Sequence, residues 1–244
     1  MTSSVNAARE TLSDHKNLKN REWDFDLDDT LHDASSHIFG QLRTSMTDYV
    51  VRHLAVTQTQ ANQLRHAYWQ RYGATLLGLV RHHAVDSRHF LQETHRLPEL
   101  ERHLRCHQQD RAALARLPGR KFVLTNAPAQ YAWRVLTHLR LAPLFDGVIC
   151  VEQMRMFGHL RPKPDARMLR FVLARLKLKA TNCVLVEDTL AHQKSANRLH
   201  MHTIWMQRWL KTDSQRSRLH RRPAYVGERV TSLMAIRRCH RSLR

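Results

Sequence analysis

The sequence predicts an α/β fold: a parallel sheet with helices on both faces, and a helical domain inserted after the first strand. Short apolar runs alternate with segments of helical periodicity over residues 106–210, as is typical of buried parallel strands joined by crossover helices. A long stretch with helical spacing, residues 36–105, separates the first apolar run from the others. With 244 residues, 42% of them hydrophobic, the chain is long enough for a core and an accessory domain.

The first expected strand runs from Trp23 to Leu27, where apolar residues alternate with aspartates. The inserted segment is expected to be helical because apolar residues recur every three or four positions around 46–54 and 64–72. Helices are also expected at 129–141 and 165–178. They lie between four apolar runs that read as buried strands, at 122–124, 147–151, 183–186 and 202–206. This alternation predicts a Rossmann-like parallel sheet.

Both ends of the sequence are expected to lie outside these domains. The first twenty residues are polar and contain no apolar stretch of the kind a secretory signal needs. The net charge of the chain is +19, and residues 208–244 alone contribute +9 of it, which suits weak electrostatic binding to polyanions. The expected division is a polar leader (1–20), a core (21–35 and 106–210), a helical cap (36–105) and a basic C-terminal segment (211–244).

Composition also favours a cytoplasmic protein without a membrane anchor. No apolar run approaches the roughly 18–20 residues that a membrane span requires. The four cysteines are far apart and show no Cys-x-x-Cys spacing, which argues against a disulfide scaffold and against a cysteine zinc site.

The scarce acidic residues are concentrated in one short segment. Five of the 21 aspartates and glutamates lie between Asp24 and Asp33. A polar turn with scattered acids is one interpretation. However, crowded carboxylates repel one another and raise one another's pKa, and a divalent cation is the usual means of neutralising them.

Polar residues follow three of the expected strands at the point where each ends. They are Asp26 with Asp28, Thr125 with Asn126, and Glu187 with Asp188. In open parallel sheets the carboxyl ends of the strands form the edge where ligands bind. The sequence therefore predicts that these three segments meet in one crevice.

An Asp-x-Asp pair at such an edge suits phosphoryl transfer. One carboxylate can attack phosphorus, and the other can protonate the leaving oxygen and later activate water. Attack on a dianionic phosphate requires charge neutralisation, which Mg²⁺ at an all-oxygen site and a fixed lysine would supply. Lys163 lies between two prolines, Asp188 can complete a magnesium ligand set, and Thr125 can donate its hydroxyl to a phosphate.

These segments resemble the four motifs of the haloacid dehalogenase superfamily of phosphohydrolases, in the same order across roughly residues 23–210. More narrowly, five segments resemble the bacterial pyrimidine 5′-nucleotidase branch: 72–76, 125–127, 156–165, 186–190 and 222–226. The resemblance implies an α/β core in which the inserted helical cap closes over the substrate and excludes water.

The resemblance also implies residue roles. Asp26 would be the nucleophile that forms an aspartyl-phosphate, and Asp28 the general acid and base. Lys163 would steady the intermediate, and Thr125 would bind the phosphate together with Asn126. The implied cofactor is Mg²⁺. Its ligands would be the carboxylate of Asp26, the backbone carbonyl of Asp28 and, to complete the set, the side chain of Asp188.

The implied activity is hydrolysis of a small phosphate monoester, with a pyrimidine nucleoside 5′-monophosphate as the leading substrate. One alternative is a phosphatase for another small metabolite, such as a sugar phosphate, phosphoglycolate or a flavin nucleotide. A second alternative is an inactive or moonlighting member that binds nucleic acid through its basic segment.

Three residues depart from the pattern of the branch. Asp24 stands at an apolar strand position and offers a second register, with Asp24 as nucleophile and Asp26 as acid and base, although Thr30 fits only the first register. His192 stands where related chains usually carry Asn or Asp. His200 replaces an expected glycine, at a cost of about 1 kcal/mol if its backbone is left-handed.

Several aromatic and basic residues of the cap are candidates for the face over the substrate, although a helical bundle also needs aromatic packing. They are Trp69, Tyr72, Arg81, His82 and His83.

Overall fold

The computed structural model describes residues 21–209 and 222–236 of the chain. The polar leader expected at residues 1–20 lies outside the described residues, as do 210–221 and 237–244 of the expected basic segment. Within the described ranges, no helix is both long enough and apolar enough to cross a membrane.

A six-stranded sheet with the order β3-β2-β1-β6-β7-β8 forms the core, and all of its pairings are parallel. Its strands are β1 (Glu22–Phe25), β2 (Arg120–Leu124), β3 (Gly147–Ile149), β6 (Cys183–Glu187), β7 (His202–Met206) and β8 (Glu228–Val230). The first five coincide with the apolar runs of the sequence. The predicted α/β fold with a parallel sheet and an inserted helical cap is thus confirmed.

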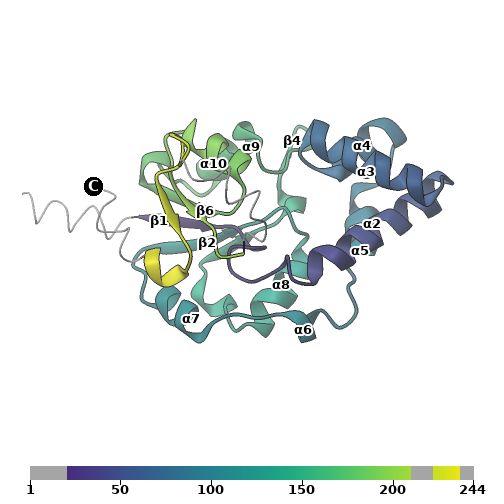
Figure 1. Cartoon of the computed structure of the whole chain (residues 1–244). Coiled ribbons are helices and arrows are strands. Elements are labelled where there is room, and N and C mark those ends of the chain that lie inside the picture. Colours follow the sequence, from purple (N-terminus) through teal and green to yellow (C-terminus); the bar gives the residue numbers. More distant parts are fainter. Residues whose placement is uncertain (1–20, 210–221, 237–244) are drawn as a thin grey trace, which may run out of the picture.

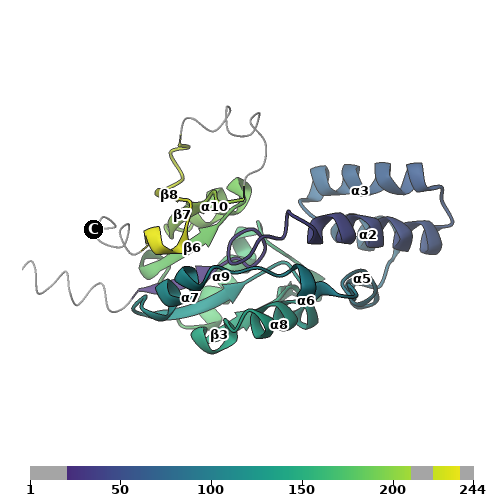
Figure 2. The same ribbon diagram turned by 60° about the horizontal axis from the view of Figure 1, so that its bottom comes forward.

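Helices cover both faces of this sheet (Figure 1, Figure 2). Trp23 and Phe25 of β1 pack into the apolar cluster of one face, together with residues of α7 (Gln108–Ala115) and α8 (Ala129–His138). Phe122 and Leu185 of the neighbouring strands point to the opposite cluster, with α9 (Ala166–Arg175) and α10 (Leu190–Asn197). Burial on both faces explains why these strands are nearly continuous apolar runs.

Four helices form the cap, which extends away from the sheet in both views. They are α2 (Ile38–Leu54), α3 (Gln58–Tyr72), α4 (Thr75–His83) and α5 (Ser87–Thr94). The cap has its own apolar cluster, which includes Tyr49, Val50 and Leu79. The α3–α4 packing depends on Gly78, because a Cβ there would lie 2.1 Å from Cγ of Tyr68.

The end of the expected cap segment belongs to the core instead. Leu97, Leu104 and Leu100, which begins the short helix α6 (Leu100–His103), are buried in the same cluster as Trp23 and Phe25. The sequence pattern placed them in the cap because helical periodicity continues through this region.

Two contacts fix the cap against the core. Next to the short helix η2 (Val151–Gln153), the hairpin of β4 (Arg155–Met156) and β5 (His159–Leu160) reaches the cap. There Arg155 Nη2 donates a hydrogen bond to Ser87 Oγ at 2.6 Å. On the other side, the turn between α3 and α4 touches the loop that carries Lys163, because a Cβ on Gly73 would lie 3.4 Å from Cδ of Pro164. The cap and the loop that carries Lys163 are therefore direct neighbours.

The described part of the C-terminal segment, residues 222–236, is built into the core. Strand β8 pairs with β7, and Gly227 N donates to Thr203 Oγ1 at 2.9 Å. Val230, Leu233 and Ile236 are buried in the main cluster. The expectation of a separate basic segment is therefore wrong for this part. Its apolar residues are too few and too widely spaced among arginines to stand out in the sequence.

Candidate active site

The carboxyl ends of the central strands bring the expected residues to one edge of the sheet. Asp26 directly follows β1, and its amide donates to Val186 O at 2.9 Å. Thr125 directly follows β2, and its amide donates to Ile149 O at 3.0 Å. Glu187 ends β6, the strand on the other side of β1. Parallel pairing with β1 in the centre thus places all three side chains at the same edge.

Lys163 connects two of these strand ends. Its side chain is fully buried, and Nζ lies 2.6 Å from Asp26 Oδ1 and 2.7 Å from Glu187 Oε2. Burial alone would lower the pKa of the ammonium group, but the two carboxylates outweigh it and raise that pKa. Lys163 therefore carries a fixed positive charge at the edge.

Asn126 holds the backbone of Lys163 in place. Its Nδ2 donates to Lys163 O at 2.9 Å, and its Oδ1 accepts from Lys163 N at 2.9 Å. The sequence assigned Asn126 to phosphate binding, but both ends of its amide are occupied by this pairing. Its observed contacts are those of a positioning residue.

Three acidic side chains form a candidate metal site. One carboxylate oxygen from each of Asp26, Glu187 and Asp188 lies within 4.8 Å of the others, and we call this set the acidic trio. Burial and the charge of Glu187 raise the pKa of Asp26 to about 8, and the same two causes raise the pKa of Asp188 well above its usual value. A third cation ligand, Glu187, was not among the residues expected from the sequence, although it precedes Asp188 in the same motif.

The donor set of the acidic trio fits a divalent cation. Three carboxylates and one lysine carry a formal charge of −2 when all are ionised, and all the ligand atoms are hard oxygens of the kind that Mg²⁺ prefers. Burial and the neighbouring carboxylates raise the pKa values of Asp26 and Asp188, and a cation bound at the trio would oppose both causes.

Glu187 is the carboxylate of the trio that is best supported by the protein. Burial alone would raise the pKa of Glu187, but the neighbouring His192 and Lys163 outweigh burial and bring this pKa below its usual value. Nδ1 of His192 lies 2.9 Å from Glu187 Oε2, and Thr189 N donates to Glu187 Oε1 at 3.1 Å. The histidine that departs from the pattern of the branch thus faces a carboxylate of the site.

Asp28 lies at the same edge, but its carboxylate is not part of the acidic trio. Its Oδ1 accepts from Tyr131 OH at 2.6 Å and pairs with His32 Nε2 at 2.9 Å. Burial and the charge of Asp28 raise the pKa of Tyr131, so the phenol remains a donor. No hydrogen bond within the described ranges occupies Oδ2 of Asp28. Neither contact could be predicted from the sequence: Tyr131 lies on α8, 103 residues from Asp28, and no motif includes His32.

Thr125 is buried beside this set, and its hydroxyl accepts from Ala127 N at 3.0 Å. The hydroxyl hydrogen therefore remains free to donate to a ligand. By contrast, Asp29 is turned toward the loop that follows, where it accepts hydrogen bonds from Ala34 N at 2.9 Å and Ser35 N at 2.8 Å.

Asp24 lies inside β1 and not at its end. It pairs in register with Phe122 and Leu185, and burial raises the pKa of its carboxyl to about 7. Asp24 lies two residues before Asp26, which directly follows the strand. This position favours the register with Asp26 as the leading carboxylate. His200 has a φ of 63°, so it occupies the left-handed backbone position that a glycine would fill without strain.

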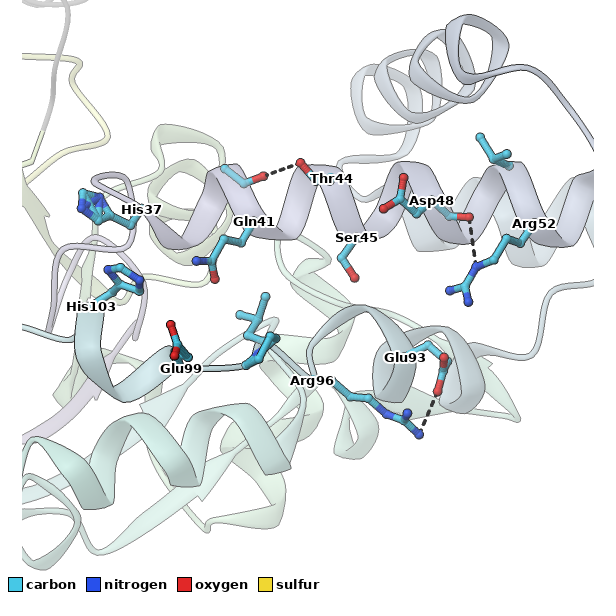
Figure 3. A pocket seen from close by; sticks show the side chains of 14 residues that line it. His37, Gln41, Thr44, Ser45, Asp48, Arg52, Glu93, Arg96, Glu99 and His103 are labelled. Atoms are coloured by element: carbon cyan, nitrogen blue, oxygen red, sulfur yellow. Dashed lines mark hydrogen bonds and ion pairs between the residues drawn. The ribbon is translucent and has the colours of Figure 1, made fainter.

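A groove lies on the cap side of the molecule. This groove of about 1430 Å³ separates α2 from the segment that follows α5, and none of the acidic trio lines it. Figure 3 shows α2 and this segment facing each other across the groove. The side chains that meet there carry both signs of charge and include His37, Asp48, Arg52, Glu93, Arg96, Glu99 and His103.

The chain is similar to known proteins in sequence and in fold. A family model described as haloacid dehalogenase-like hydrolase matches residues 25–200. Phosphate metabolism protein 8 of Saccharomyces cerevisiae is 24% identical over 185 residues, which cover 70% of this chain but only 57% of that protein. The chain therefore spans less than two thirds of this curated relative.

Two solved structures illustrate the range of activities on this fold. A HAD phosphatase from Thermococcus onnurineus aligns with a TM-score of 0.60 and 16% identity, covering 90% of this chain and 97% of that one. The L-2-haloacid dehalogenase from Xanthobacter autotrophicus aligns with a TM-score of 0.56 and 15% identity, covering 92% and 100%. At these identities the likeness shows a common fold, and the activity must be argued from the site.

Proposed function

The chain belongs to the haloacid dehalogenase-like hydrolase family, and we propose that it is a Mg²⁺-dependent phosphomonoesterase that works through an aspartyl-phosphate. The observation that carries this proposal is the position of Lys163 Nζ, 2.6 Å from Asp26 Oδ1 and 2.7 Å from Glu187 Oε2. This arrangement places a fixed positive charge next to the carboxylate that would attack a phosphoryl group.

In the first step, a carboxylate oxygen of Asp26 attacks phosphorus, and the bond from phosphorus to the ester oxygen breaks. Asp26 must be ionised to attack, and burial together with the charge of Glu187 raises its pKa to about 8, so that added positive charge would favour the attacking form. Mg²⁺ held by the acidic trio would supply that charge and would also neutralise the phosphoryl oxygens. Thr125 donates its free hydroxyl hydrogen to one of those oxygens.

Asp28 serves as the proton carrier in this mechanism. Tyr131 and His32 hold its Oδ1, and Oδ2 is left to carry the proton that passes to the leaving oxygen. In the second step, the same oxygen takes a proton from the water that attacks phosphorus of the aspartyl-phosphate. Inorganic phosphate leaves, and Asp26 and Asp28 return to their starting states.

The negative charge at the edge distinguishes this chemistry from dehalogenation. A 2-haloacid carries its own carboxylate into the site, and three further carboxylates would repel it. A phosphate monoester that arrives with a divalent cation has the opposite effect, because the cation is attracted to the same three side chains.

For the substrate class, we propose a nucleoside 5′-monophosphate with a pyrimidine base. Support comes from the segments that resemble the pyrimidine 5′-nucleotidase branch, which include the cap turn 72–76 beside the catalytic loop and residues 161–165 around Lys163. A cytoplasmic location is part of this proposal, and Cys106, Cys150 and Cys183 are free thiols, as expected in a reducing compartment.

The test is phosphate release from a panel of substrates with Mg²⁺: UMP, CMP, p-nitrophenyl phosphate, phosphoglycolate and a sugar phosphate. We expect turnover that EDTA abolishes and Mg²⁺ restores, with UMP or CMP giving the highest kcat/KM. Higher kcat/KM with phosphoglycolate or a sugar phosphate would correct the substrate class only. Turnover no higher than that of an Asp26→Asn variant on every substrate would contradict the phosphatase itself.

A further inference from the structure

The α3–α4 pair of the cap carries positive charge with no acidic residue nearby in sequence. Between Asp48 and Asp86 the sequence contains no aspartate or glutamate. Elsewhere in the described ranges, eight arginines pair with carboxylates: Arg96, Arg102, Arg120, Arg134, Arg161, Arg167, Arg208 and Arg222. No ion pair in those ranges involves the arginines of α3 and α4. Their charge is therefore available to an outside ligand.

Two of these arginines converge on one aromatic ring. The guanidinium carbon of Arg71 lies 5.4 Å from the centre of the Tyr72 ring, and that of Arg81 lies 5.9 Å from it. The hydroxyl of Tyr72 is also hydrogen-bonded to His82 Nε2 at 2.6 Å. Arg71, Arg81 and His82 are all exposed. Both guanidinium groups are thus held near one ring on the surface, and each can still receive an anion from solvent.

An exposed tryptophan extends this face. Trp69 is 60% exposed, and the His66 ring stacks against it at 6.4 Å between centres. Packing does not explain these side chains, because Ala61 is the single buried residue of α3 in the structure. We call Trp69, Arg71, Tyr72, Arg81 and His82 the basic-aromatic surface.

We propose that the basic-aromatic surface binds single-stranded nucleic acid. Arginines without a carboxylate partner can neutralise successive phosphates, while the exposed ring of Trp69 offers stacking to an unpaired base and the guanidinium planes of Arg71 and Arg81, held over Tyr72, add cation–π contacts. A duplex would present phosphates but no free base faces to these rings. A membrane would need an apolar face, and Val80 is the one exposed large aliphatic residue of α3 and α4.

This binding goes beyond the proposed hydrolysis, although Trp69, Tyr72, Arg81 and His82 are also among the residues that the sequence nominates for the face over the substrate. A probe without a phosphate monoester measures the binding apart from the hydrolysis. The binding is also distinct from binding by the basic residues near the C-terminus. The two sources of positive charge are far apart in sequence, so that separate variants can distinguish them.

Fluorescence anisotropy of the full-length protein with a labelled oligothymidylate tests the proposal. The probe has about 12 nucleotides and a 5′-hydroxyl, so it offers no phosphate monoester to the catalytic site. The variants are Trp69→Ala and the double variant Arg71→Ala/Arg81→Ala. Arg116→Ala is the matched control, since it is an exposed arginine directly after α7, a helix far from the cap in Figure 1. A second comparison is Arg241→Ala/Arg244→Ala, near the C-terminus.

We expect Trp69→Ala to weaken Kd about tenfold, through the loss of one stacking platform. The double arginine variant should weaken Kd by a similar factor and reduce the slope of log Kd against log salt by about 1.4, for two phosphate contacts at about 0.7 each. Arg116→Ala should leave Kd within twofold. Thermal unfolding of each variant checks that the fold is intact.

Three results would overturn the proposal. The first is no binding at 100 mM salt. The second is binding that the C-terminal variant removes and the cap variants leave unchanged. The third is tighter binding to a duplex of the same length, or to phosphatidylserine vesicles, than to the single strand.

Discussion

The edge of the sheet at the acidic trio is negatively charged, and the α3–α4 pair of the cap is positively charged. The two regions differ in whether their charges are buried and paired. At the edge, Asp26 and Glu187 are buried and are paired with the fixed cation of Lys163. On the cap, Arg71 and Arg81 are exposed and have an aromatic ring, not a carboxylate, as their neighbour.

This difference suits the two regions to different tasks. A buried charge is costly unless it is paired, so the edge is locked into one geometry by its own contacts. An exposed charge without a partner costs little and keeps its affinity for an external ion. The edge is therefore suited to act on one bound group, and the cap to meet a larger ligand.

The largest effect should come from removing the leading carboxylate of the edge. We expect Asp26→Asn to lower phosphate release by about 10⁴-fold or more, because the amide cannot attack phosphorus. The matched control is Asp24→Asn, two residues earlier in the same strand. It should keep kcat within about tenfold. The reverse outcome, with Asp24 essential and Asp26 dispensable, would establish the other register.

Removing the cation of the edge should have the next largest effect. We expect Lys163→Ala to lower kcat about 10²- to 10³-fold, because the phosphoryl charge loses a fixed partner. The variant should also be less stable by about 3–5 kcal/mol, since two buried carboxylates lose their counter-charge. Steady-state kinetics and urea unfolding measure the two effects. Lys194→Ala, an exposed lysine on α10, should change neither; a similar loss in that variant would show that the effect is general.

A smaller effect distinguishes positioning from packing at Asp28. We expect Tyr131→Phe to lower kcat about tenfold for an alkyl ester such as UMP. The Asp28 carboxyl group then loses the hydrogen bond that orients it for proton transfer to the leaving oxygen. With p-nitrophenyl phosphate, whose leaving group needs no proton, the loss should be less than threefold. Equal losses on both substrates would mean that Tyr131 serves only to fill space in the core.

The smallest expected effect is on stability, at a residue between the two regions. Burial lowers the pKa of His95, whose ring packs against Tyr131, to about 4. Between pH 6.5 and 4 the unfolded chain binds a proton at this histidine that the folded chain does not, so stability falls as the pH falls through this range. Between pH 7 and pH 5, His95→Gln should reduce that fall by about 2 kcal/mol or less.

Urea unfolding at pH 7 and pH 5 measures the difference for His95→Gln. The exposed His138 on α8 provides the control, and His138→Gln should retain the pH dependence of the original protein. An unchanged pH dependence in His95→Gln would show that this residue is protonated alike in both states.

The sequence predicted the sheet well because buried parallel strands leave continuous apolar runs. It missed β8, because two of the three residues of this strand are charged and leave no apolar run. It predicted that the ends of β1, β2 and β6 meet, since topology alone requires it. It did not predict the contacts of Asp28 or the third carboxylate of the trio. Those depend on side-chain directions, and Tyr131 is 103 residues from the group it contacts.

The side-chain amide of Asn126 pairs with the backbone N–H and C=O of Lys163, as peptide groups of neighbouring strands pair in a sheet. A carboxamide offers an acceptor and a donor in one plane, as a peptide group does, and here it meets both polar groups of one residue 37 positions away. An aspartate would keep only the accepting half, and a glutamine would overreach by one methylene. The backbone of Lys163 is thus held by one side-chain amide that follows the end of β2, and neither aspartate nor glutamine could make both of these hydrogen bonds.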